Sequence, residues 1–261
     1  MEINKLYCLD CMQFLDLLPD CVIDLAIVDP PYNIKVAKWD TFPSEKAYFD
    51  FTYQWIDKLI PKLKSTASIY LFNTPLNNAI ILNYLINKGL KYRNWIIWYK
   101  KDGFSPSKKR YVNNQESVLF LTVSDLYKFN ADDVRVPYLS SSRIAHATKK
   151  GILKNGKRWF PNPKGKYCSD VWEYSSVRHT TKVNGRVKKQ IHPTMKPVDM
   201  IKRMILASSG VSDLVLDLFS GMGTTSKACI ELNRNFVGCE NNSEYFEQIK
   251  ENINGTCIEQ I

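Results

Sequence analysis

The 261-residue sequence predicts an α/β fold built on a mostly parallel sheet with one antiparallel strand. Short apolar runs alternate with amphipathic segments over residues 1–129, and the same alternation returns over residues 191–261. Between them, residues 130–190 are rich in basic, aromatic, glycine and proline residues. This change of composition predicts a loop-rich lobe, inserted between two segments that together form one α/β domain.

The first part of the chain contains four apolar or β-branched runs, which we predict to be strands: 22–29, 67–73, 92–100 and 117–123. The last two follow each other without a helix-length connection, which favours an antiparallel pair. Two helices are predicted between the strands, over residues 44–64, with Ser44 as the N-cap, and over residues 76–87.

The last part of the chain repeats the strand–helix pattern. Its predicted elements are helices over 198–208, 224–232 and 244–253 and strands over 213–219 and 235–240. Strands and helices at this spacing form βαβ units, which place the strands in one parallel sheet.

The positive charge of the protein lies in the inserted segment. Residues 130–192 contain 14 lysines and arginines against 4 aspartates and glutamates, which accounts for the whole formal net charge of +10. Clustered positive charge binds a polyanion by releasing its condensed counterions, whereas a solvated surface needs no such clustering. Six large aromatic residues in the same segment argue against a disordered linker. The segment therefore predicts a nucleic-acid-binding surface.

Cysteine usage and hydropathy predict a cytoplasmic protein without a membrane segment. The seven cysteines are scattered, an odd number that does not resemble a disulfide framework. Cys8 and Cys11 form a CxxC pair, but no second pair of ligands at metal-binding spacing accompanies it, so we expect no metal site. The first residues lack the basic start and apolar run of a signal peptide.

A glycine turn follows the predicted strand at 213–219. The segment from Asp217 to Thr225 (DLFSGMGTT) opens a helix, and Gly221 and Gly223 let a ligand approach the backbone closely. Glu240 ends the next strand, where a carboxylate can accept hydrogen bonds from both ribose hydroxyls. The segment lacks the third glycine and the phosphate-binding lysine of nucleotide motifs, so S-adenosylmethionine fits it better than NAD or ATP.

A second motif, Asp29-Pro30-Pro31-Tyr32, ends the strand at 22–29. The alternative reading is a strand-terminating turn, but two prolines and a tyrosine after a buried aspartate are unusual for one. The lone pair of an exocyclic amine such as adenine N6 is delocalised into the ring. Asp29 and the Pro30 carbonyl can accept its two N–H hydrogens and turn that lone pair toward a methyl donor. Tyr32 offers a face on which an extruded base can stack.

These motifs and His192-Pro-Thr-Met-Lys-Pro197 together resemble the β-class amino-methyltransferases of bacterial restriction–modification systems. The order also resembles that class, because the DPPY segment comes first and the glycine turn last, a circular permutation of the usual order. The resemblance implies a Rossmann-like S-adenosylmethionine methyltransferase fold with an inserted target-recognition lobe. It further implies an adenine-N6 DNA methyltransferase that flips its target base and transfers the methyl group directly.

The resemblance divides the chain into a catalytic half (1–129), a basic target-recognition region (130–190) and a cofactor-binding half (191–261). It gives catalytic roles to Asp29, Pro30, Pro31 and Tyr32. The expected cofactor-binding residues are Asp10, Cys11, Asp29, Lys196, Pro197, Asp217, Phe219, Ser220, Gly221, Gly223, Thr224, Glu240 and Asn241. The expected DNA-binding residues are Arg110, Arg143, Arg158, Arg178, Lys188 and Lys189.

Three residues depart from those frequent in the class: Leu9, Leu218 and Met222. The backbone contacts of the cofactor site should survive these changes, although Met222 is expected to alter the width of the pocket.

The expected partners are double-stranded DNA and, within the same system but without direct contact, a cognate restriction endonuclease. The oligomeric state stays open. Cytosine-N4 methylation is the nearest alternative function, although Asp29 favours adenine because serine is commoner there in cytosine enzymes. Methylation of RNA or of a protein amine, and a non-enzymatic cofactor sensor, are more distant alternatives.

Overall fold

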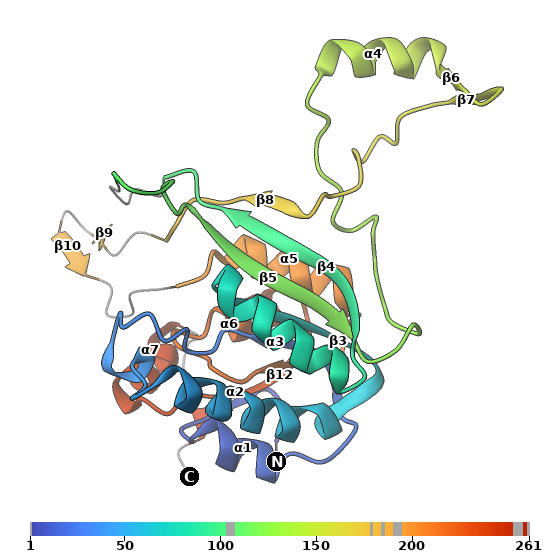
Figure 1. Ribbon diagram of the computed structural model, residues 1–261. Helices are drawn as coiled ribbons and strands as arrows, with labels where there is room; N and C mark the ends of the chain where they lie inside the picture. Colours follow the sequence, from blue (N-terminus) through green and yellow to red (C-terminus); the bar gives the residue numbers. More distant parts are fainter. Residues whose placement is uncertain are drawn as a thin grey trace.

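The computed structural model describes residues 2–102, 108–177, 180–183, 186–189, 195–252 and 258–259 (Figure 1). Arg178 and the first three residues of the HPTMKP motif lie outside the described residues, so the structure does not place them. Across the described part of the chain, no helix is long and apolar enough to span a membrane.

One nine-stranded sheet organises the described residues, in the order β13-β1-β12-β11-β2-β3-β5-β4-β8. Every neighbouring pair in it is parallel except the two pairs made by β5, so β5 is its one antiparallel strand. The strands are β1 (Lys5–Tyr7), β2 (Ile23–Val28), β3 (Leu63–Asn73), β4 (Lys91–Tyr99), β5 (Gln115–Thr122), β8 (Val171–Glu173), β11 (Leu214–Asp217), β12 (Asn235–Cys239) and β13 (Ile258–Glu259). The predicted mostly parallel sheet with one antiparallel strand is confirmed.

Two sets of helices cover the two faces of the sheet (Figure 1). One face packs against α1 (Cys11–Leu17), α2 (Glu45–Leu59) and α3 (Pro75–Asn87). The other packs against α5 (Val198–Ser208), α6 (Thr224–Glu231) and α7 (Ser243–Asn252). The central strands are apolar on both faces because each face is covered, as in doubly wound α/β proteins.

Most predicted elements occur within a few residues of their expected bounds, but the helix predicted over 44–64 is too long. Ser44 caps α2 as expected, since its side chain accepts a hydrogen bond from the Ala47 amide at 3.1 Å. The α-helix stops at Leu59, and a short 3-10 turn, η2 (Ile60–Lys62), leads directly into β3. Pro61 explains the difference, because proline lacks the N–H that would continue the helix.

The inserted segment contains more regular structure than its composition predicts. It holds α4 (Ser141–Lys150) and two short hairpins, β6 (Ile152–Lys154) with β7 (Lys157–Trp159) and β9 (Thr180–Val183) with β10 (Arg186–Lys189). Helix α4 and the β6–β7 hairpin project away from the sheet (Figure 1). The chain then returns as β8, which pairs in parallel with β4 at the sheet edge, a strand that the sequence did not predict.

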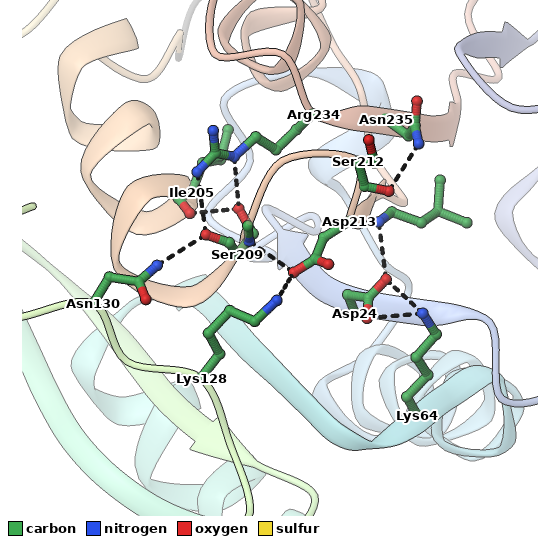
Figure 2. A network of polar contacts seen from close by, with 12 residues as sticks. Asp24, Lys64, Lys128, Asn130, Ile205, Ser209, Ser212, Asp213, Arg234 and Asn235 are labelled. Carbon is green, nitrogen blue, oxygen red and sulfur yellow. Dashed lines mark hydrogen bonds and ion pairs between the residues drawn. The ribbon is translucent and has the colours of Figure 1, made fainter.

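A polar network fixes the entry to this lobe at the end of the sheet opposite the carboxyl ends of β2 and β11 (Figure 2). The Asn130 side-chain amide donates to the carbonyls of Leu206 at 2.8 Å and Ser209 at 2.9 Å, where α5 ends. Lys128 pairs with Asp213 in the turn that leads to β11. Carbonyls at a helix end lack partners within the helix, so these contacts stabilise both α5 and the root of the lobe.

Candidate active site

The DPPY motif and the glycine turn open into one cavity of about 450 Å³. Both follow neighbouring parallel strands, β2 and β11, so both lie at the carboxyl edge of the sheet, where ligands bind in open α/β folds. The cavity is lined by fourteen of the expected catalytic and cofactor residues: Asp10, Cys11, Asp29, Pro30, Pro31, Tyr32, Lys196, Asp217, Phe219, Ser220, Gly221, Thr224, Glu240 and Asn241. Its volume is in the range of small-molecule sites.

Asp29 stands at the centre of a polar cluster. The Tyr32 hydroxyl donates to Asp29 Oδ1 at 2.7 Å, and the Lys196 ammonium lies 2.7 Å from Asp29 Oδ2. About a quarter of the Asp29 side chain stays exposed, toward the cavity that it lines. Lys196 was expected among the cofactor-binding residues; it lines the cavity, and the structure places its ammonium against the Asp29 carboxylate.

Glu116 and Lys100 complete this cluster, and we did not single out either from the sequence. The Tyr32 hydroxyl lies 3.4 Å from Glu116 Oε2, the Lys196 ammonium lies 3.5 Å from the same oxygen, and Lys100 pairs with Glu116. Glu116 is the second residue of β5, and it lines the same cavity as Asp29. The two carboxylates are thus balanced by two ammonium groups.

Burial and the neighbouring charges shift the pKa values of Asp29, Glu116 and Tyr32 in different directions. Burial raises the pKa of Asp29 above its ordinary value, and the Lys196 charge partly offsets this effect. Burial would also raise the pKa of Glu116, but Lys196 and Lys100 outweigh it and hold that pKa below its usual value. Burial beside two carboxylates raises the pKa of Tyr32 well above 10, so its hydroxyl stays protonated and acts as a donor.

The glycine turn forms the cofactor side of the cavity. Gly221 and Gly223 have φ values of 54° and 73°, a left-handed conformation that glycine adopts without strain. A Cβ on Gly223 would lie 2.8 Å from Ile249 Cγ2, so this glycine lets α6 and α7 pack closely rather than lining the cavity. Glu240 accepts hydrogen bonds from the amides of Gly221 at 2.8 Å and Asn242 at 2.9 Å, which orients its carboxylate.

Three acidic residues, Asp10, Asp217 and Glu240, line the cavity beside the glycine turn. Asp10 caps α1 by accepting the Met12 amide at 2.8 Å and reaches the cavity with Glu240. Asp217 lies at the foot of the turn, and burial raises its pKa from 3.8 to about 7. A set of carboxyl groups that can accept hydrogen bonds, around an apolar, nucleoside-sized space, suits the hydroxyls, amines and positive charge of S-adenosylmethionine. The residues present fit that group.

The expected DNA-binding residues are dispersed. Arg110 is exposed, and Arg143 is exposed on α4. The Arg158 guanidinium donates to the Lys150 carbonyl at the end of α4, which is a structural contact within the lobe. Lys188 and Lys189 lie on β10. Pro197, expected in the cofactor site, is instead the N-cap of α5 and does not line the cavity.

Comparison with known proteins agrees with this geometry. The family model described as DNA methylase, of the N6/N4 type, matches residues 23–251. Among relatives, the chain is 51% identical over 248 residues to the Type II methyltransferase M1.MboII of Moraxella bovis, covering 95% of each protein. It is 31% identical over 248 residues to the DNA adenine methyltransferase YhdJ of Escherichia coli (strain K12), covering 91% of this chain and 78% of that protein.

Two solved structures share the fold at low sequence identity. The PvuII cytosine-N4-specific DNA methyltransferase has a TM-score of 0.69 at 15% identity, covering 97% of this chain and 94% of that one. The M1.HpyAVI–SAM complex has a TM-score of 0.63 at 23% identity, covering 96% and 98%. The family model spans most of the chain, and both sequence relatives exceed 30% identity over most of their length. This protein therefore belongs to the N6/N4 DNA methylase family.

Proposed function

We propose that this protein transfers a methyl group from S-adenosylmethionine to N6 of adenine in duplex DNA. One observation carries the proposal: Asp29 and the Gly221 turn, expected to bind the amine and the methyl donor respectively, line the same 450 Å³ cavity. The family is one of DNA methylases, which accounts for both halves of that cavity.

When bound, S-adenosylmethionine would supply an electrophilic methyl group: the N–C bond forms as the S–C bond breaks, the thioether leaves, and the amine loses one proton afterwards. Asp29 and the Pro30 carbonyl accept the two N–H hydrogens of the target amine, which directs the nitrogen lone pair across the cavity. Tyr32 lies at the same edge, where its ring can stack on a base turned out of the helix. Its hydroxyl, fixed on Asp29 at 2.7 Å, holds the carboxylate in place for the amine.

Glu240 and Asp10 hold the nucleoside portion of the cofactor in this proposal, while the backbone of the glycine turn encloses the methionine portion. Glu240 suits the ribose because two backbone amides already fix its carboxylate, so its remaining lone pairs have defined directions. Asp217 lies where a positive charge on the cofactor would be stabilised by a carboxylate.

Adenine is favoured over cytosine by the residues and by the relatives. The chain has Asp29 where serine is commoner in cytosine-N4 enzymes, and YhdJ, at 31% identity, is named a DNA adenine methyltransferase. The cytosine-N4 enzyme among the structural neighbours is 15% identical, a level that speaks for the fold alone.

The lobe over 130–190 is the proposed target-recognition region, inserted between a catalytic half and a cofactor-binding half. Its concentrated positive charge supports contact with DNA phosphates, and the exposed Arg143 on α4 is one candidate for that contact. The relatives named Type II methyltransferases support a role in protecting cytoplasmic host DNA beside a cognate endonuclease.

The test is transfer of labelled methyl groups from S-adenosylmethionine to unmethylated duplex DNA, followed by nucleoside analysis. N6-methyladenine supports the proposal. N4-methylcytosine would show that the target base is cytosine rather than adenine, with the same mechanism of transfer. Absence of labelled DNA, with the cofactor still bound, contradicts the proposed function.

A further inference from the structure

The loop that follows the DPPY motif wraps around a buried carboxylate. Asp40, at the end of the 3-10 turn η1 (Lys38–Asp40), is 1% exposed. Its Oδ1 accepts the amides of Tyr32 at 2.6 Å and Asn33 at 2.8 Å. Its Oδ2 accepts the amides of Ile34 at 3.0 Å and Val36 at 3.2 Å. Four backbone N–H groups therefore solvate one buried negative charge.

The backbone of the loop is bent so that these amides converge. Asn33 and Lys35 have φ values of 59° and 63°, a left-handed conformation that asparagine tolerates better than lysine does. Alternation of left-handed and right-handed residues turns successive N–H groups toward one point and makes an anion-binding nest. The hydrogen bonds to Asp40 offset the conformational cost of that geometry.

Tyr32 is consequently held at three points. Its amide donates to Asp40, its carbonyl accepts from Asn77 Nδ2 at 2.8 Å, and its hydroxyl donates to Asp29. Farther along the same loop, Trp39 Nε1 donates to the Tyr245 hydroxyl of α7 at 3.4 Å. The loop thus runs from Tyr32 to a contact with α7, and its residues Ile34 and Val36 line the cavity.

We propose that Asp40 is a positioning residue for methyl transfer: its carboxylate gathers the loop amides and thereby fixes Tyr32 against Asp29. This inference rests on the proposed function, since it assigns Tyr32 to the base-binding wall. Asp40 contacts neither the base nor the methyl donor. It acts through the backbone amide of Tyr32, the residue that contacts the base.

Asp40→Asn is the informative variant because it keeps the size of the side chain. The amide has one acceptor oxygen, and its NH₂ group would face N–H donors, so at least one pair of loop amides loses its acceptor. Asp20→Asn is the matched control, since Asp20 is an exposed aspartate paired with Lys62 away from the cavity.

The first readout is amide hydrogen exchange, which requires no activity. In the wild type, the amides of Tyr32, Asn33, Ile34 and Val36 should exchange slowly, although the side chains of Ile34 and Val36 are about half exposed. In Asp40→Asn they should exchange at least about 10-fold faster, while β2 and β3 keep wild-type protection. Rapid exchange of these amides in the wild type would overturn the proposal even if the variant does not fold.

The second readout is catalysis. Asp40→Asn should lower kcat by about 100-fold, because small displacements of a reacting group have effects of that size. The dissociation constant for S-adenosylmethionine should change by less than about fivefold, since the glycine turn is untouched. Asn77→Ala frees the Tyr32 carbonyl, and with it the Asn73 and Tyr48 contacts of the same side-chain amide, and should lower kcat by about 10-fold.

Wild-type kcat in Asp40→Asn, with its loop amides released, would overturn the positioning role. The exchange measurement separates this outcome from failure of the proposed function. A wild-type protein with no methyl transfer but slow loop exchange would refute the function and leave the Asp40 contacts intact.

Discussion

Lys196 Nζ lies 2.7 Å from Asp29 Oδ2, so the carboxylate expected to bind the target amine is already paired with a cation. The same ammonium lies 3.5 Å from Glu116 Oε2 and is almost fully buried. Burial would lower the pKa of Lys196, but Asp29 and Glu116 outweigh it and raise that pKa. The DPPY carboxylate is therefore one member of a balanced four-charge cluster rather than an isolated acid.

Lys196→Met should destabilise the protein, because it leaves Asp29 and Glu116 without their shared counter-charge. Removing one partner of a buried pair costs about 3 kcal/mol or more in the free energy of unfolding. The loss should shrink as the pH falls and the two carboxylates become protonated. Urea unfolding at neutral and acidic pH measures this effect. Lys100→Met, which keeps the Asp29 pair, is the control, and an equal loss in both variants would contradict the account.

Asp217 should couple cofactor binding to proton release. Its pKa is raised from 3.8 to about 7 by burial, with Asp29 and Glu240 adding to the effect. A bound positive charge would lower this pKa, so near pH 7 a fraction of a proton should leave on binding and affinity should rise with pH. Calorimetry in buffers of different ionisation enthalpy measures the release. Asp217→Asn should release fewer protons than the wild type, and equal release would exclude Asp217 as the source.

The raised pKa of Asp217 also predicts how the stability of the protein changes with pH. A carboxyl group whose pKa is higher in the folded state favours folding when it is protonated. The contribution of Asp217 to the free energy of unfolding therefore falls as the pH rises between 3.8 and about 7, and it stays unfavourable above that range. Asp217→Asn should remove this part of the pH dependence of unfolding. Unfolding of the wild type and of this variant, measured over the same pH range, tests it.

Glu240→Gln should weaken S-adenosylmethionine binding. The substitution replaces one carboxylate oxygen by an NH₂ group and so breaks a contact with the Gly221 or Asn242 amide. The misoriented, uncharged amide would also lose a hydrogen bond from the ribose; such a bond to a charged group contributes about 1.5–3 kcal/mol, so the dissociation constant should rise roughly 10- to 100-fold. Equilibrium binding measures it against Glu231→Gln, a surface carboxylate that pairs with Lys202. Unchanged affinity would remove Glu240 from the cofactor site.

Gly223→Ala should destabilise the protein more than Gly89→Ala. Both glycines have positive φ, 73° and 92°, and both substitutions introduce strain of about 1 kcal/mol or more. A Cβ at Gly223 would also lie 2.8 Å from Ile249 Cγ2, whereas one at Gly89 meets nothing within 4 Å. Thermal denaturation of the two variants measures the difference. Equal melting temperatures would show that α7 yields at this contact.

The elements that the sequence predicts well are those whose pattern is local. The runs of β2 and β3 are buried on both faces, and α5 has the bounds expected from its periodicity, 198–208. Strand β8 has only three residues, and it forms because β4 presents an edge far away in the sequence. No local pattern carries that information.

Some residues of the candidate site can likewise be predicted from local sequence, and others cannot. Asp29, Tyr32 and Glu240 follow from motifs at the ends of strands, which the sequence makes visible. Asp40 and Lys100 do not, because their roles depend on a folded loop and on a partner sixteen residues away. An aspartate eight residues after the motif tyrosine, at the end of the mixed polar and apolar segment 33–40, is the one signal that could have indicated Asp40.

The most direct test of the account is the rate of methyl transfer by Asp29→Asn in single turnover, measured beside its affinity for S-adenosylmethionine. The variant keeps the side-chain size but removes the charge that accepts the amine hydrogen and pairs with Lys196. The account predicts a fall in rate of about 100-fold or more with cofactor binding retained. Transfer at the wild-type rate would contradict it.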